Sequence, residues 1–62
     1  MYLVKWFDEK HQKAQVLTYP NLPSASLVAS ALHFAMGIEV TVFDSYRVLV
    51  CHEKITEVHF PV

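Results

Sequence analysis

The chain has 62 residues, of which 53% are hydrophobic and 18% are charged, and its formal net charge is -1. This length predicts one domain over residues 1–62, and the hydrophobic content excludes a disordered chain. A nucleic-acid binder normally carries an excess of Lys and Arg. The five basic residues set against six acidic ones therefore argue against nucleic acid as a partner.

The N-terminal residues and the cysteine content bear on the compartment. Residues 1–6 contain no basic stretch followed by a long apolar run, and no segment approaches the roughly 20 apolar residues of a membrane-spanning helix. Cys51 is the only cysteine, so an internal disulfide is impossible and a reducing compartment is favoured. We therefore expect a cytoplasmic protein that has no membrane partner.

The first third of the chain predicts a β-hairpin. Residues 1–7 are rich in side chains that favour strands. The residues that share one face of this strand are Tyr2, Val4 and Trp6. Residues 8–13 are polar throughout and predict a short loop, after which residues 14–19 predict the second strand of the hairpin.

A single helix is predicted over residues 24–36. Pro20 and Pro23 end the preceding strand structure, because two prolines so close together cannot sit in a central ladder. Either Pro23 or Ser24 is expected to open the helix, and its alanine-rich content favours helical structure. Gly37, the only glycine, follows the last apolar position and is expected to close the helix in a left-handed conformation.

The last third of the chain predicts further strands. Residues 38–43 alternate and are β-branched, and residues 46–51 follow after a turn at residues 44 and 45. Residues 55–60 are a candidate fifth strand, which the pattern leaves open. The expected fold is α+β, with the order β-β-α-β-β-(β) and one helix packed on an antiparallel sheet.

The helix is apolar over more of its circumference than one sheet can cover. On a helical wheel the apolar arc is much wider than the ~100° stripe that faces one sheet, and Leu32 and Met36 lie at the margin of the sheet-facing stripe. The arc consists of Leu27, Val28, Ala31, Leu32, Phe34, Ala35 and Met36. Ala25 and Ala29 extend the apolar arc, and we interpret them as surface alanines that favour helix formation. The polar strip is formed by Ser26, Ser30 and His33.

Both faces of the predicted sheet are partly apolar, although a single helix covers only one face. Large exposed apolar patches usually mark interaction sites, so we expect a protein partner and, first of all, a homodimer. Binding is expected on the uncovered sheet face or by strand addition at an open edge. The candidate partner-binding residues are Tyr2, Trp6 and Tyr46 as aromatic anchors, Arg47 as a charged anchor, and Leu32 and Met36.

The histidines and the cysteine do not form a recognisable reactive or metal-binding motif. Adjacent residues of a strand point to opposite faces, so Cys51 and His52 cannot readily bind the same ion. The spacing of His11, His33, His52 and His59 matches no zinc motif. We expect no metal, no cofactor and no catalytic residue, with Cys51 serving as a small buried strand residue.

The sequence resembles no family that we recognise, and its simple architecture does not by itself specify a function. The expected function is that of a small non-enzymatic interaction module, an inhibitor or regulator comparable in size with phage or mobile-element accessory proteins. An alternative is a homodimeric ligand-binding or enzyme-like protein whose site, between subunits, uses His33, Cys51 and His52. A third hypothesis is a single-stranded nucleic-acid binder that uses aromatic residues on the sheet.

Overall fold

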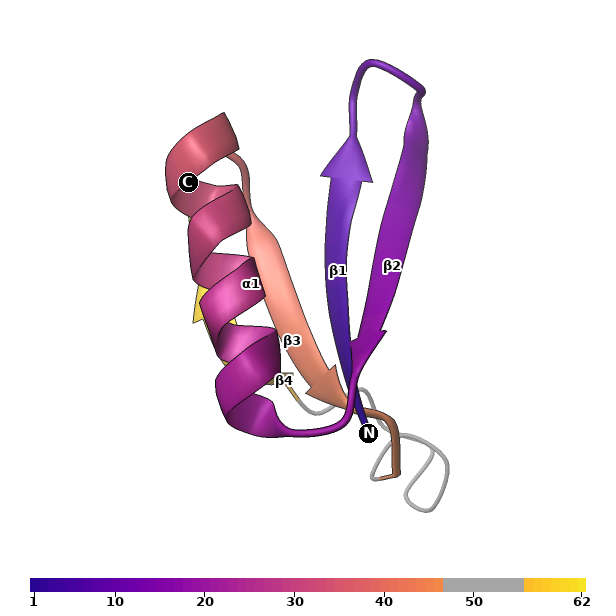
Figure 1. Cartoon of the computed structure of the whole chain (residues 1–62). Helices are drawn as coiled ribbons and strands as arrows, with labels where there is room; N and C mark the ends of the chain where they lie inside the picture. Colours follow the sequence, from indigo (N-terminus) through magenta and orange to yellow (C-terminus); the bar gives the residue numbers. More distant parts are fainter. Residues whose placement is uncertain (47–55) are drawn as a thin grey trace.

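The computed structural model describes residues 1–46 and 56–62, which form one helix packed on a four-stranded sheet. The elements in chain order are β1 (Tyr2–Asp8), β2 (Lys13–Tyr19), α1 (Leu22–Met36), β3 (Val40–Asp44) and β4 (Thr56–Phe60). The strand order across the sheet is β2-β1-β3-β4, and every neighbouring pair is antiparallel (Figure 1). The predicted α+β class and the helix on an antiparallel sheet are confirmed.

The strands largely follow the prediction. The first three begin and end within two residues of their predicted bounds, and the candidate fifth strand forms as β4 at the edge beside β3. The predicted strand 46–51 lies outside the described residues except for Tyr46, whose backbone is helical. At the end of β3, the amide and the hydroxyl of Ser45 both donate to the Met1 carbonyl, which ties this turn to the start of β1.

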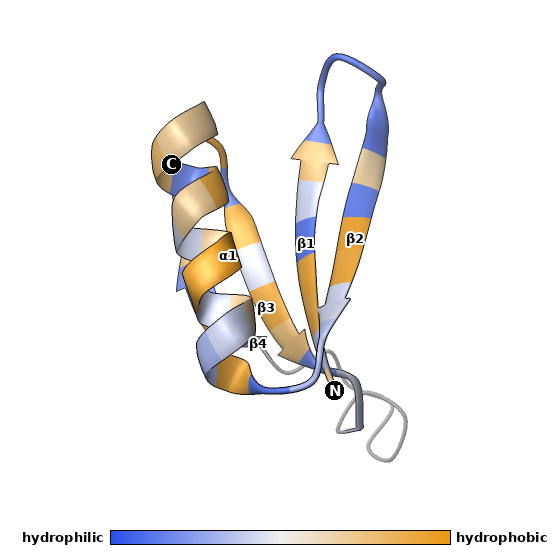
Figure 2. Cartoon of the chain, viewed as in Figure 1, coloured by the Kyte–Doolittle hydropathy of each residue, from blue (hydrophilic) through white to orange (hydrophobic). Residues whose placement is uncertain are grey.

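The hairpin of β1 and β2 is regular along its whole length. Seven residue pairs run from Tyr2 opposite Tyr19 to Asp8 opposite Lys13. The connecting loop is closed by Asp8, whose Oδ1 accepts from the amides of residues 10 and 11, a local arrangement that aspartate favours in turns. Figure 2 shows that this connection is hydrophilic, in contrast to much of the strands that it joins.

Helix α1 starts earlier than predicted. Asn21 has an extended backbone and its side chain accepts from the Ser24 amide at 2.9 Å, so Asn21 is the N-cap and neither Pro23 nor Ser24 opens the helix. Pro23 lies in the first turn, where its missing N–H would have no partner within the helix. At the other end Gly37 adopts φ 65° and its amide donates to the His33 carbonyl, which confirms the predicted C-terminal cap.

The core between α1 and the sheet is built from small side chains. Its fully buried residues are Val4, Ala25, Ala29, Val40 and Val42. Larger side chains are only partly buried and pack around these five, namely Tyr2, Trp6, Tyr19, Leu22, Leu32, Ile38, Val58 and Phe60. A core with so little fully buried volume fits a domain near the lower size limit for independent stability.

The side of the helix that faces the sheet carries two small residues. The interpretation of Ala25 and Ala29 as surface alanines is wrong, because both are fully buried. Leu27 and Phe34, which belong to the wide apolar arc of the wheel, are exposed. Leu27 lies about 200° around the helix from Ala25, because successive residues are about 100° apart. The two alanines allow the helix backbone to approach the valines of β1 and β3 closely, and this contact directs the bulky side chains outward.

The prediction that Tyr2 and Trp6 lie on the uncovered sheet face is wrong. Both residues share the face of Val4 in β1, and both pack against the core under the helix while remaining partly exposed. The strand pattern alone cannot choose between the two faces, because residues 3 and 7 on the opposite face are also apolar.

The contact between α1 and the sheet can be tested with one pair of substitutions. Ala29→Leu is expected to destabilise the fold by about 1–3 kcal/mol, because the extra side chain has no space against the valines. Ala31→Leu, which adds the same atoms on the exposed side of the helix, is expected to change stability by less than about 0.5 kcal/mol. Chemical denaturation measures both. Equal effects of the two substitutions would contradict the observed orientation of the helix.

Candidate protein-binding surfaces

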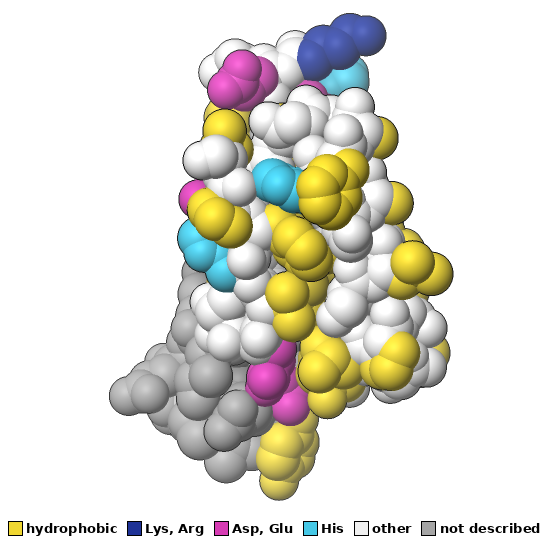
Figure 3. Space-filling view, turned by 90° about the vertical axis from the view of Figure 1, so that its left-hand side faces the viewer, with side chains coloured by type: hydrophobic (Ala, Val, Ile, Leu, Met, Phe, Trp, Pro, Cys, Tyr) yellow, Lys and Arg dark blue, Asp and Glu magenta, His cyan; other side chains and the backbone are white. Residues whose placement is uncertain are grey.

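The side of α1 that points away from the sheet is apolar. We call it the outer helix face, and it consists of Pro23, Leu27, Ala31 and Phe34. Leu27 is 72% exposed and Phe34 is 78% exposed. Figure 3 shows hydrophobic side chains running down one side of the molecule, with Lys and Arg appearing only at its upper end.

The charge content of α1 makes this exposure unusual. None of its fifteen residues is Lys, Arg, Asp or Glu. A surface helix normally places charged residues opposite the stripe that packs on the core, whereas scattered single apolar residues on a surface are common. Here the exposed apolar residues recur at spacings of three and four, which aligns them along one face. The outer helix face therefore has the pattern of a second packing surface.

His33 has a structural environment at the C-terminal end of α1. Its Nδ1–H donates to the Ile38 carbonyl at 2.8 Å, which fastens the helix end to the segment that leads into β3. The imidazole ring lies 5.0 Å from the Phe34 ring and 5.6 Å from the Phe60 ring, measured between centroids. The alternative site between subunits also needs Cys51 and His52, which lie outside the described residues.

The second exposed surface is the face of the sheet opposite the helix. We call it the open sheet face. Strand registers place on it Leu3, Lys5, Phe7, Ala14, Val16, Thr18, Thr41 and Phe43. Phe7 and Val16 are exposed, and the remaining apolar side chains are Leu3 and Phe43, which are half-buried, and Ala14. This face is mixed in polarity because Lys5 and Thr41 lie beside each other at its centre.

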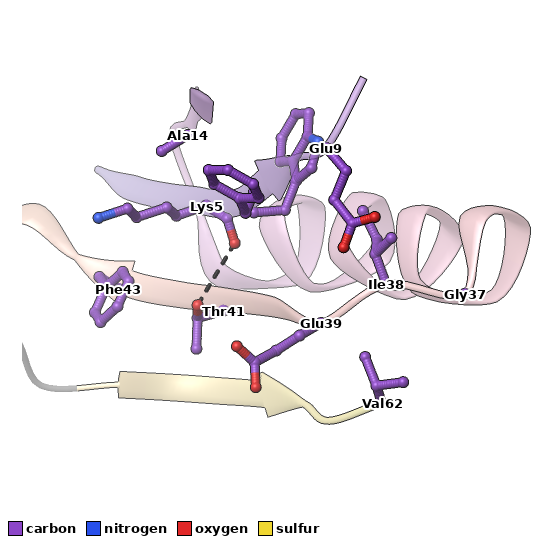
Figure 4. A pocket seen from close by; sticks show the side chains of 11 residues that line it. Lys5, Glu9, Ala14, Gly37, Ile38, Glu39, Thr41, Phe43 and Val62 are labelled. Carbon is purple, nitrogen blue, oxygen red and sulfur yellow. Dashed lines mark hydrogen bonds between the residues drawn. The ribbon is translucent and has the colours of Figure 1, made fainter. Parts of the chain in front are cut away.

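A shallow groove of about 610 Å³ begins on the open sheet face and extends to the end of the chain. Its aromatic lining residues are Trp6, Phe7 and Phe43. Lys5 and Glu9 both line the groove, and the Thr41 hydroxyl donates to the Lys5 carbonyl at 3.5 Å (Figure 4). Glu39, which also lines the groove, accepts from His59 Nε2 at 3.2 Å. Charges of both signs line the groove, so it shows no preference for an anionic or a cationic ligand.

The structure separates the predicted partner-binding residues. Tyr46 and Met36 are exposed, whereas Leu32 is half-buried against the core, as are Tyr2 and Trp6. Arg47 lies outside the described residues. Whether any of these residues contacts a partner stays a prediction. The exposed residues Leu27, Phe34, Phe7 and Val16 are not among the partner-binding residues predicted from the sequence. The missed signal in α1 was the helical spacing of residues 27, 31 and 34 opposite two small residues.

Within residues 1–46 and 56–62, no three His, Cys, Asp or Glu side chains lie close enough together to hold a metal ion. In the same part of the chain, no helix is both long and apolar enough to cross a membrane. No protein-family model, curated protein or solved structure matches this chain. The proposals below therefore come from the surfaces of the chain itself.

The hairpin loop contains a carboxylate with a shifted pKa. His11 Nδ1–H donates to Asp8 Oδ2 at 2.6 Å, and this hydrogen bond is the main cause that holds the pKa of Asp8 below its usual value. Partial desolvation opposes the shift, while the His11 amide and the Gln15 side chain support it. The depressed pKa means that the loop is stabilised above the unfolded-state pKa of Asp8, and that this stabilisation is lost as the pH falls through the folded-state pKa.

An NMR titration of the Asp8 carboxyl tests this loop. We expect its pKa below the usual value in the unchanged protein, and a rise toward that value in His11→Ala, because the principal hydrogen-bond donor is removed. Lys10→Ala is the control, since only the backbone amide of Lys10 bonds Asp8. An unchanged Asp8 titration in His11→Ala would contradict the assigned cause.

Proposed function

We propose that this protein is a small non-enzymatic interaction module that docks on a larger protein through the outer helix face. The observation that carries the proposal is a fifteen-residue helix without a charged side chain, whose Leu27 and Phe34 project away from the core. The matching partner surface is an apolar groove that receives one face of a helix, a recurring recognition mode. Ala31 lies between the two large side chains and lets the groove approach the helix backbone.

The energetics indicate how much of the face must take part. Complete burial of a leucine or phenylalanine contributes roughly 1.5–3 kcal/mol. Association has to offset roughly 4–15 kcal/mol of lost translational and rotational freedom. Two anchors alone therefore do not give a stable complex. The other two residues of the outer helix face, Pro23 and Ala31, have to be buried as well, which implies a groove that runs along most of the helix.

The role within a cell follows from the same proposal. A module that binds without catalysis acts on its partner by blocking or recruiting it, which is the action of an inhibitor or regulator. Phage and mobile-element accessory proteins of similar size offer an analogy for such a role, and a cytoplasmic location stays our expectation from the sequence. The proposal needs no cofactor.

A second candidate function is single-stranded nucleic-acid binding on the open sheet face. Phe7 and Phe43 lie on this face in the two central strands, with Lys5 on the same face. Aromatic residues on a sheet can stack with bases, and a basic residue beside them can contact the phosphate backbone. The net charge of -1 weighs against this function, so it ranks second.

Charge substitutions on the outer helix face test the first proposal. Leu27→Glu and Phe34→Glu are each expected to weaken capture of the partner from the native host at least tenfold, because a buried, unpaired carboxylate opposes docking. Their thermal stability is expected to change little, since both residues are exposed. The matched control is Val62→Glu, which adds the same charge at a residue that is 90% exposed and lies outside α1. Unchanged capture in both Leu27→Glu and Phe34→Glu, or an equal loss in Val62→Glu, would overturn the proposal.

A titration with fluorescent oligouridylate at two salt concentrations tests the second candidate. The docking proposal predicts no saturable binding at either concentration. Binding that weakens with salt and is lost in both Phe7→Ala and Lys5→Ala would instead establish the nucleic-acid function. Thr18→Ala is the control, because this residue lies on the same face at the edge of the sheet.

A further inference from the structure

Strand β2 is a long and unprotected edge of the sheet. It pairs with β1 along all seven residues, and no other strand of the described residues lies on its outer side. Five of its seven residues are exposed, including Val16 at 49% and Leu17 at 40%, which point to opposite faces. An edge strand of this kind presents a row of backbone N–H and C=O groups that another strand can pair with.

The usual features that prevent edge pairing are missing from β2. It contains no proline, its register with β1 has no bulge, and its only charged residue is Lys13 at its first position. The opposite edge differs. Strand β4 has five residues, and its pairing with β3 is interrupted by a register shift between Val42 and Phe43. The two edge strands therefore differ in regularity: β2 pairs with its neighbour without interruption, whereas the pairing of β4 contains a register shift.

Helix α1 covers only part of β2, where Tyr19 packs against the core. The helix packs mainly on β3 and β1, and Figure 1 shows the β1–β2 hairpin extending away from it. Leu17 therefore remains exposed although it lies on the helix side of the sheet, opposite Val4. A partner strand can therefore reach the outer edge of β2 and the exposed side chains Val16 and Leu17 on its two faces. A partner strand could therefore be accommodated without moving any described element.

We propose that two copies of this protein associate by pairing β2 with β2 in antiparallel orientation, with Val16 on the two-fold axis. This pairing joins two four-stranded sheets into one of eight strands. The axis is perpendicular to the sheet, because only that operator relates two antiparallel edge strands of identical copies. Both helices then lie on the same side of the joined sheet.

The charge and residue pattern of β2 is self-complementary in this register. Full overlap of the seven-residue strand with its copy places Val16 beside Val16 and Gln15 beside Leu17. Lys13, the single charge of the strand, lies opposite Tyr19, so no like charges meet. A shift by one residue would pair side chains from opposite faces, which disfavours neighbouring registers. The side chains of β2 are therefore compatible with those of a second copy of β2 in this register.

The small core gives such an assembly a physical benefit. Among residues 1–46 and 56–62, three valines and two alanines are fully buried, and domains of this size are often stabilised by oligomerisation. Joining the edges pairs the free backbone groups of β2 and covers apolar surface beside Val16. This inference does not depend on the docking proposal, because the outer helix face lies on α1, away from the β2 edge.

Sedimentation velocity across protein concentrations tests the dimer. We expect a reversible monomer–dimer equilibrium that Val16→Glu shifts at least tenfold toward monomer, because the two new carboxylates meet at the axis. Within one copy this substitution is tolerated, since residue 16 lies opposite Lys5. The matched control is Thr18→Glu, whose carboxylate faces Ala14 of the second copy in the proposed register and leaves the dimer largely intact. Circular dichroism verifies that each variant is folded.

Cysteine substitutions test the register itself, in a Cys51→Ser background. Directly opposite residues of antiparallel strands have Cα atoms about 4.5–5.5 Å apart, which suits a disulfide. Val16→Cys is therefore expected to form a crosslinked dimer under mild oxidation. Thr18→Cys is not, because its two copies are four residues apart along the strands, about 13 Å.

Three results would overturn the inference. The first is a protein that stays monomeric at several hundred micromolar. The second is equal crosslinking of Val16→Cys and Thr18→Cys, which indicates random collision. The third is a dimer that resists Val16→Glu but is lost in Phe34→Glu, which would place the interface on the outer helix face. Loss of partner capture in Phe34→Glu with an unchanged dimer leaves this inference standing, so the two proposals fail separately.

Discussion

The rest of the structure depends on the close contact between two alanines of α1 and three valines of the central strands. Ala25 and Ala29 pack on Val4, Val40 and Val42, and these are the fully buried residues of the protein's described part. Small side chains on both sides hold the helix close to the sheet, so bulky residues cannot enter the centre of the contact. The large apolar residues lie either around its rim, as Leu32 and Phe60 do, or on the far side of the helix, as Leu27 and Phe34 do.

The second constraint is the width of the helix relative to the width of the sheet. A helix with its side chains is about 10–12 Å across, whereas four strands spaced about 4.8 Å apart make a sheet of roughly 15–20 Å. One helix centred on β1 and β3 therefore leaves an outer strand uncovered. At the β4 edge, rings from α1 and β4 meet through His33 and Phe60. At the β2 edge Tyr19 packs against the core, but Leu17 on the same side of the sheet remains exposed.

The sequence predicted the elements far better than it predicted their faces. Strand alternation, the glycine after the helix and the polar hairpin loop are local signals, and each element they indicated within the described residues is present. The direction of the helix is not local, since apolar residues surround it and the pattern has no single preferred side. The pattern favours Ala25 and Ala29 as surface residues, because alanine promotes helix formation and has no strong preference for burial. Their packing role depends on the contact with the valines of the sheet, which is not local in sequence. Asn21 was missed because the two flanking prolines were read as a break, although asparagine before a first-turn proline is a start signal.

The outer helix face and the β2 edge can be used at the same time, which affects how tightly a partner is bound. If two copies pair through β2, the two-fold axis perpendicular to the sheet places both copies of α1 on the same side. Strands β1 and β2 of each copy then lie in the middle of the joined sheet and separate the two helices. The outer helix faces therefore remain open. A dimer of this form presents two identical docking faces with fixed spacing. Binding of the first face raises the effective concentration of the second, so a weak single contact gives much tighter binding to a partner that repeats its groove at the same spacing. A single copy with two anchors gains no such enhancement, and in this way the β2 edge would compensate for the small area of the outer helix face.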